Sequence, residues 1–116
     1  MVTHVVLMKP RPDLPAADRR AFAAAFERAV HEIATIRGVR IGRRVRHGAA
    51  YEAGAPDAAD YLAIIDFDDI DALQAYLRHP AHEELGARFG QALSSACVYD
   101  FEVGGLADLA DLSDRA

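Results

Sequence analysis

The sequence predicts an α+β fold of the ferredoxin-like type, in which the order β-α-β-β-α-β builds one half of a dimeric α/β barrel. Three observations predict it. Four short segments have the composition of strands, and longer segments between them carry apolar residues at helical spacing. One face of the resulting sheet stays apolar after both helices are placed on the other face.

The first half of the chain supplies a strand, a helix and a second strand. Residues 3–8 form a strand of Val and Leu type that turns His4 towards the helices. A loop with three prolines follows, and residues 16–36 then carry an apolar stripe of helical period. Gly38 is the expected C-cap of this helix, and residues 39–46 form the second strand.

The second half repeats the pattern with one interruption. A loop over residues 47–60 leads into a strongly apolar strand, residues 61–67. Residues 70–78 are helical, and Pro80 then starts a new helix that extends to about Ser95. The last strand covers residues 97–103.

The elements form one domain, residues 1–103, followed by a tail, residues 104–116. The tail carries three leucines among charged residues, so both an amphipathic turn on a partner subunit and disorder remain open. The uncovered sheet face carries Val5, Leu7, Leu62 and Ile64. A twofold homodimer that packs sheet against sheet is the simplest way to bury them.

Composition excludes several classes of function. The net charge is −5 and Lys9 is the only lysine, while the arginines between residues 37 and 46 fit the polar face of a strand, so nucleic-acid binding is not expected. No apolar run is long enough to span a membrane, and a cytoplasmic protein is expected. Cys97 is the only cysteine, and the sequence contains no phosphate-binding or dinucleotide motif, so no cofactor is expected.

The break between the two C-terminal helices carries the main candidate site, in residues 76–82, Tyr-Leu-Arg-His-Pro-Ala-His. His82 falls in the first turn after Pro80, on the same helix face as Phe89, so its imidazole should point inward. Burial and the positive end of the helix dipole should hold its pKa below the free value of about 6.5. A neutral imidazole is what a general base needs.

Each candidate residue also has a structural interpretation. His82 is either a base or a hydrogen-bonded inward histidine, and Tyr76 either assists it or fills space. His4 either lines a pocket with His82 or is a buried polar group. His79 fits a helix cap better than a ligand, and no metal site is expected because the His79-x-x-His82 pair lacks a third ligand; an adventitious cation near His4 and His82 stays open.

The sequence resembles the stress-responsive dimeric α/β barrel family over about residues 3–103. The resemblance is carried by residues 4–7 (His-Val-Val-Leu), Phe22, Phe26, Gly42, residues 76–82 and residues 99–101 (Tyr-Asp-Phe). It implies catalytic roles for Tyr76 and His82, because they match a Tyr–His pair of a polyketide cyclase in that family. It also implies that His4 lines the pocket and that Phe22 and Phe26 surround an apolar substrate tail.

Two departures from that cyclase change the expected pocket, because Tyr61 replaces a histidine and Ala23 replaces a phenylalanine. The expected function is a small cofactor-free cyclase or isomerase that removes a proton next to a carbonyl of a ketide-like or aromatic metabolite. The alternative is a non-catalytic, stress-associated barrel that binds a small apolar ligand. The residues expected to bind substrate are His4, Phe22, Phe26, Tyr61, Ile65, His79 and Phe89.

Overall fold

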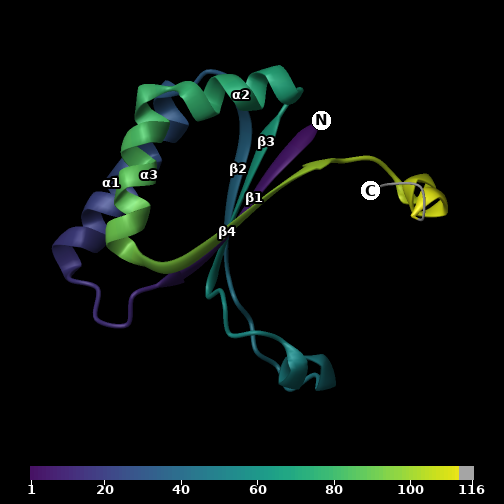
Figure 1. The fold of residues 1–116 in the computed structure, drawn as a ribbon, viewed down its shortest axis with the longest axis horizontal. Helices are drawn as coiled ribbons and strands as arrows, with labels where there is room; N and C mark the ends of the chain where they lie inside the picture. The colour runs from purple at the N-terminus through teal and green to yellow at the C-terminus, as the bar shows by residue number, and fades with distance from the viewer. Residues whose placement is uncertain (113–116) are drawn as a thin grey trace.

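The computed structural model describes residues 1–112 and contains four strands and three α-helices in these residues (Figure 1). The elements are β1 (Val2–Pro10), α1 (Ala16–Glu32), β2 (Ile36–Arg43), β3 (Tyr61–Phe67), α2 (Ile70–Arg78), α3 (Pro80–Ala92) and β4 (Leu93–Glu102). Two short 3-10 helices, η1 (Ala50–Gly54) and η2 (Leu106–Asp111), lie in the β2–β3 loop and in the C-terminal segment. This order confirms the predicted ferredoxin-like fold, including the break between α2 and α3.

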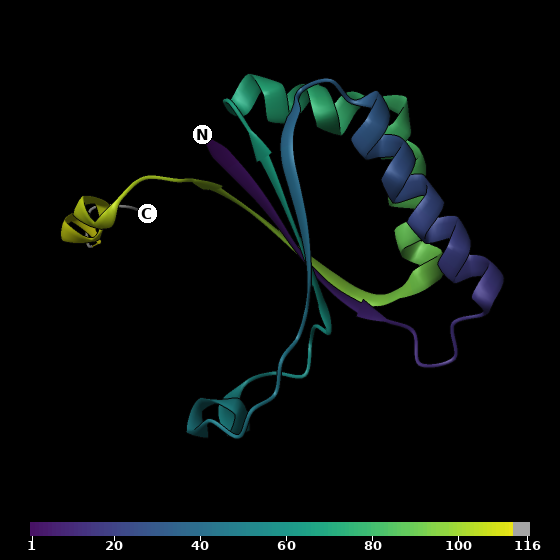
Figure 2. The ribbon, with the colours of Figure 1, turned by 180° about the vertical axis from the view of Figure 1, so that it is seen from behind.

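The strands form one antiparallel sheet in the order β2-β3-β1-β4. All three helices lie on the same side of this sheet, as the two opposite views show (Figures 1 and 2). The register pairs His4 with Ile65 on one neighbouring strand and with Asp100 on the other. These three side chains therefore share the helix-covered face. No helix within residues 1–112 is long and apolar enough to cross a bilayer.

The ends of three elements differ from the prediction. Helix α1 ends at Glu32 with Ile33 as its C-cap, and Gly38 lies inside β2 next to a register shift. Ile33 and Ile36 suit both a helix face and a strand, so the periodicity did not mark the boundary. Helix α3 ends at Ala92, because β4 already pairs with the end of β1 from Leu93 onwards.

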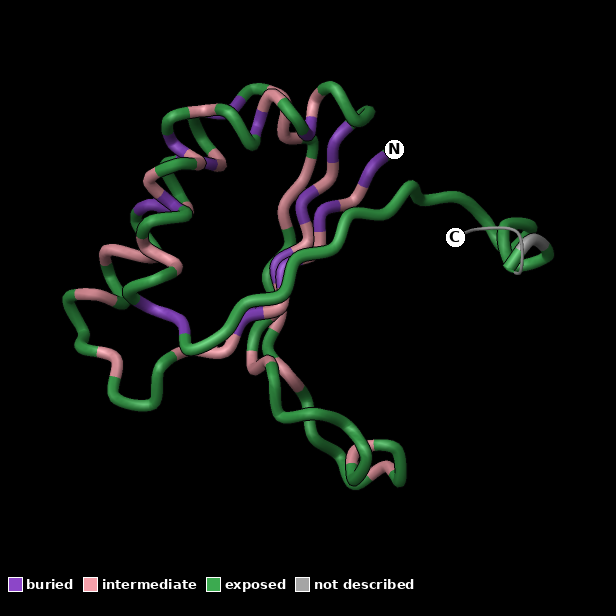
Figure 3. Tube along the Cα trace, in the orientation of Figure 1, coloured by how far each residue is buried: buried purple, intermediate pink, exposed green. Residues whose placement is uncertain are grey.

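The core lies between the helices and the central strands β1 and β3 (Figure 3). Ala63, Ile65 and Phe67 alternate along the inner face of β3 and are almost fully buried. In contrast, β4 is exposed on both of its faces from Ser94 to Glu102. An edge strand with both faces open leaves apolar side chains in water, among them Val98, Tyr99 and Phe101.

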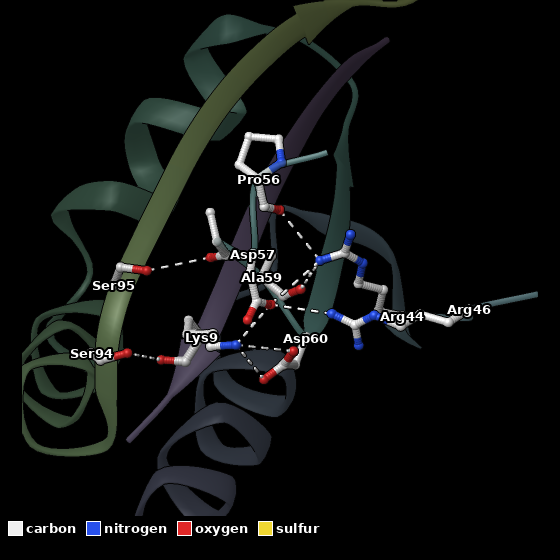
Figure 4. A network of polar contacts seen from close by, with 10 residues as sticks. Lys9, Arg44, Arg46, Pro56, Asp57, Ala59, Asp60, Ser94 and Ser95 are labelled. Carbon is white, nitrogen blue, oxygen red and sulfur yellow. Dashed lines mark hydrogen bonds and ion pairs between the residues drawn. The ribbon is translucent and has the colours of Figure 1, made fainter. Parts of the chain in front are cut away.

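A polar network fastens the β2–β3 loop to the body of the protein (Figure 4). The Lys9 ammonium lies 2.9 Å from an Asp57 carboxylate oxygen and 3.4 Å from Asp60. This hydrogen bond raises the pKa of Lys9 and lowers that of Asp57. Arg44 donates to the Pro56 and Ala59 carbonyls. Exposed ion pairs contribute little to stability individually, so the network serves mainly to place the loop.

The C-terminal segment leaves the sheet at Val103, whose N–H donates to the Met1 carbonyl. It forms one 3-10 helix, η2, which projects away from the rest of the molecule (Figures 1 and 2). The predicted tail continues to residue 116, and its last four residues, 113–116, lie outside the described part of the chain.

Candidate active site

The helix break positions the first candidate residues. Helix α2 ends at Arg78, and His79 serves as its C-cap and as the N-cap of α3. The His79 Nδ1 atom accepts a hydrogen bond from the Ala81 N–H at 3.0 Å, which confirms the predicted capping role. Pro80 occupies the first turn of α3, where its missing N–H costs nothing. His82 follows in that turn and is half-buried.

The centre of the candidate site is a row of three neighbouring rings, which we call the ring stack. Tyr76 is buried between His82, at 4.7 Å between ring centroids, and His4, at 5.6 Å. Both contacts are edge-to-face. The Phe67 ring lies 5.1 Å from Tyr76 and supports it from the core. The structure thus brings together Tyr76, His82 and His4, which the sequence proposed from three different elements.

Asp100 adds an acidic group that the sequence analysis did not select. Its Oδ1 atom lies 2.5 Å from Nδ1 of the buried His4. An ionised carboxylate only accepts, so the His4 Nδ1–H donates, and in the neutral ring Nε2 is left as an acceptor. The available signals were its place in the predicted last strand and in the family-matching run 99–101, but only the cross-strand pairing with His4 indicates a role for Asp100.

The surroundings of the site shift the pKa values of two side chains. The pKa of His82 lies below its ordinary value of 6.5, chiefly because burial disfavours the imidazolium and secondly because His4 is close. The Leu77 backbone and the Glu83 carboxylate act in the opposite direction and are outweighed. Burial, reinforced by the charge of Asp100, raises the pKa of Tyr76 to about 12. The site therefore favours a neutral imidazole beside a phenol that keeps its proton.

The lowered pKa of His82 predicts a loss of stability in acid. The unfolded chain binds a proton at this imidazole more readily than the folded chain does, so protonation favours unfolding. The His82 contribution is fully present above about pH 6.5 and is lost as the pH falls through the folded-state pKa. Urea unfolding of wild type and His82→Asn between about pH 8 and pH 5 measures this. Wild type should lose stability relative to the variant on acidification, and a constant difference would contradict the assignment.

A separate apolar groove of about 650 Å³ lies between α1 and the sheet. Three of the predicted substrate-binding residues, Phe22, Phe26 and Tyr61, line it together with Met8 of β1 and Val39 and Ile41 of β2. Arg11 and Arg19 also lie along the groove. The wall described by these residues does not include His82, Tyr76 or His4.

A layer of buried apolar side chains lies between the groove and the ring stack along β1. Along the inner face of β1, His4 belongs to the stack, Val6 is buried, and Met8 lines the groove. Four residues of strand place His4 and Met8 about 13 Å apart. The half-buried Phe89 packs 5.3 Å from Phe22 between their ring centroids, and Ile65 is fully buried in the core. The apolar groove and the ring stack therefore occupy different parts of the helix-covered face.

Metal-binding side chains do not gather in the part of the chain that the structure describes. Residues 1–112 contain no group of three or more His, Cys, Asp or Glu side chains placed to hold one ion.

Comparisons with known proteins agree with this fold. A family model described as the stress responsive A/B barrel domain matches residues 2–103. A solved Arabidopsis thaliana protein superimposes with a TM-score of 0.75 at 19% identity, covering 91% of this chain and 98% of the other. The hydroxynitrile lyase of Passiflora edulis gives 0.73 at 13% identity, covering 89% and 93%.

A third solved structure is a Bacteroides fragilis protein described as dimeric, ferredoxin-like and of unknown function. It gives a TM-score of 0.61 at 24% identity, covering 88% of this chain and 95% of the other. A search among curated protein sequences found no significant match. At these identities, the three solved structures support the fold, and the chemistry has to be argued from the ring stack itself.

Proposed function

The chain belongs to the stress-responsive A/B barrel family, and from that premise we propose that it is a cofactor-free catalyst of proton transfer next to a carbonyl group. Its substrate would be a ketide-like or aromatic metabolite, and the outcome would be a cyclisation, an isomerisation or a lyase-type cleavage. The observation that carries the proposal is the buried Tyr76 phenol held between the imidazoles of His82 and His4. The hydroxynitrile lyase among the structural relatives supports lyase chemistry on this fold.

Each group has a role suited to its protonation. The neutral His82 accepts the proton that leaves the carbon next to the carbonyl. The Tyr76 hydroxyl keeps its proton and donates a hydrogen bond to the enolate oxygen that develops. Asp100 holds the His4 ring through Nδ1, which leaves Nε2 available as a polar contact for the substrate. The half-buried His82 and the Asp100 side chain, which is 43% exposed, give this stack access to solvent.

Hydrogen–deuterium exchange tests the proposal without knowledge of the natural substrate. The protein is incubated in D₂O at neutral pH with phenylacetone or with a 1,3-diketone carrying an alkyl tail, and loss of the α-proton signal is followed by NMR. The proposal expects exchange well above the buffer rate, with saturation as the ketone concentration rises. Exchange at the buffer rate for every ketone would overturn it.

A second function is favoured by the layer between the groove and the ring stack. A groove whose wall does not include His82, Tyr76 or His4 suits a non-catalytic barrel that holds an apolar ligand against α1 and leaves the histidines structural. Two-dimensional NMR separates the two cases. Under this alternative, the same ketones shift the amide signals of groove residues such as Phe22 and Tyr61 without any catalysed exchange.

The proposed assembly is a homodimer that packs through the sheet face without helices. Tyr99 and Phe101 are each 52% exposed on that face, beside the half-buried Val5 and Leu7. Such a contiguous apolar surface marks an interface, and twofold pairing covers it on both copies. Related structures of this fold are described as dimeric. Light scattering at micromolar concentration should give twice the chain mass, and a stable monomer would contradict the assembly.

A further inference from the structure

We infer that the C-terminal segment, residues 103–112, docks in trans into a second groove on the outer face of the partner subunit's sheet. This inference rests on the homodimer proposed above and adds a specific contact to it. The occupant is a second copy of this chain, through its η2 helix.

The segment presents an apolar ridge with no cover from its own chain. Leu106, Leu109 and Leu112 are 86%, 57% and 72% exposed. A 3-10 helix has three residues per turn, so side chains three positions apart lie above one another. Leu106 and Leu109 therefore share one edge of η2, and Leu112 follows as its C-cap; the helix projects from the body of the protein (Figures 1 and 3). Three large exposed apolar side chains so close together are typical of a surface that binds a partner.

The receiving groove has a volume of about 400 Å³ and is a different cavity from the one under α1. Its floor is the outer face of the sheet, at Leu7, Gly42 and Leu62, and its wall is the β2–β3 loop, at Pro56, Ala58 and Ala59. The contacts of Lys9 and Arg44 hold that wall in place (Figure 4). The groove is thus a defined apolar depression with a fixed wall.

The positions of ridge and groove favour docking between chains. The segment leaves the sheet beside Met1, whereas the groove lies near Leu7, about 20 Å further along β1. The segment also follows the edge strand β4, whereas Gly42 lies on the opposite edge strand, β2. Twofold symmetry can set β4 of each copy beside β2 of the other, which closes both edges of the barrel with two identical contacts.

Charge complementarity supports the same pairing. Asp108 lies between Leu106 and Leu109 of the segment and is exposed. Arg43 lines the groove, and Arg40 stands exposed on the same strand. The carboxylate of Asp108 beside the leucine ridge would therefore meet guanidinium groups beside the apolar groove.

Disulfide trapping in the full-length chain tests the inference. In a Cys97→Ser background, chains carrying Leu109→Cys are mixed with chains carrying Ala58→Cys, allowed to exchange subunits and oxidised with copper phenanthroline. The expected result is a cross-linked dimer, seen on a non-reducing gel, that requires both variants. The matched control replaces Ala58→Cys by Ala17→Cys on the exposed side of α1, and it should give at most a small fraction of that yield.

The outcomes separate this inference from the proposed assembly. A wild-type monomer by light scattering would overturn both the homodimer and the docking. A wild-type dimer with a cross-link no stronger than the Ala17→Cys control would overturn the docking alone. A doubly substituted chain, Leu109→Cys with Ala58→Cys, that cross-links only within one chain would also overturn it, because the contact would then lie in cis.

Discussion

Replacing His82 by Asn should lower the catalysed α-proton exchange of a ketone by about 10²–10⁴-fold, the usual contribution of a positioned general base. Asparagine is polar and of similar size, but its amide is not basic and cannot take the proton. The half-buried position of His82 makes large structural damage from this change unexpected. The rate of exchange at saturating ketone measures the effect, and circular dichroism checks the fold.

Two further variants identify the source of the loss. His47→Asn removes an exposed imidazole in the β2–β3 loop, where it contacts Tyr51, and should leave the exchange rate unchanged. Tyr76→Phe keeps the ring stack but removes the hydroxyl, so the rate should fall while the folded structure persists. A folded His82→Asn protein that retains the wild-type rate would show that His82 is a structural residue.

Replacing Phe67 by Ala should lower the free energy of unfolding by about 3–5 kcal/mol. Phe67 is 0% exposed and lies at the end of the inner face of β3, where its ring supports Tyr76. Truncation removes buried apolar surface and leaves a cavity that rigid neighbours fill only in part. Such a loss is a large share of the stability of a domain this size.

Urea unfolding at one fixed protein concentration measures the Phe67 effect, since the stability of a dimer depends on concentration. The matched control is Phe67→Leu, which keeps most of the volume and should lose less. A loss below about 1 kcal/mol for the alanine variant would mean that the pocket around Phe67 collapses around the smaller side chain.

The parts of the site that depend on local sequence were predictable. Pro80 marks the helix break unambiguously, because proline cannot continue a helix, and its position fixes His82 in the first turn of α3. The alternation of β1 likewise places His4 inward. The role of Asp100 was not predicted, because it comes from pairing with a residue 96 positions away. The sequence of one strand does not determine its register with a neighbouring strand.

The division between the groove and the ring stack was also beyond the sequence. Phe22, Phe26 and Phe89 all follow helical periodicity, which assigns them to inner faces but does not say which cavity each one borders. Their arrangement depends on how α1 and α3 pack, which places the Phe89 ring 5.3 Å from the ring of Phe22, a residue of the groove wall. Tertiary packing therefore determines the separation of the groove from the ring stack, the feature that distinguishes the two proposed functions.

The separation of the groove from the ring stack also bears on how this domain can diversify. Substitutions at groove positions of α1, such as Arg19 and Ala23, act on a wall that does not include the rings of His4, Tyr76 and His82. A duplicated copy of this domain can thus change its groove and still retain the three residues to which we assign proton transfer. Selection can act on preference and on chemistry one at a time, which makes a small barrel of this kind an economical starting point for new specificities.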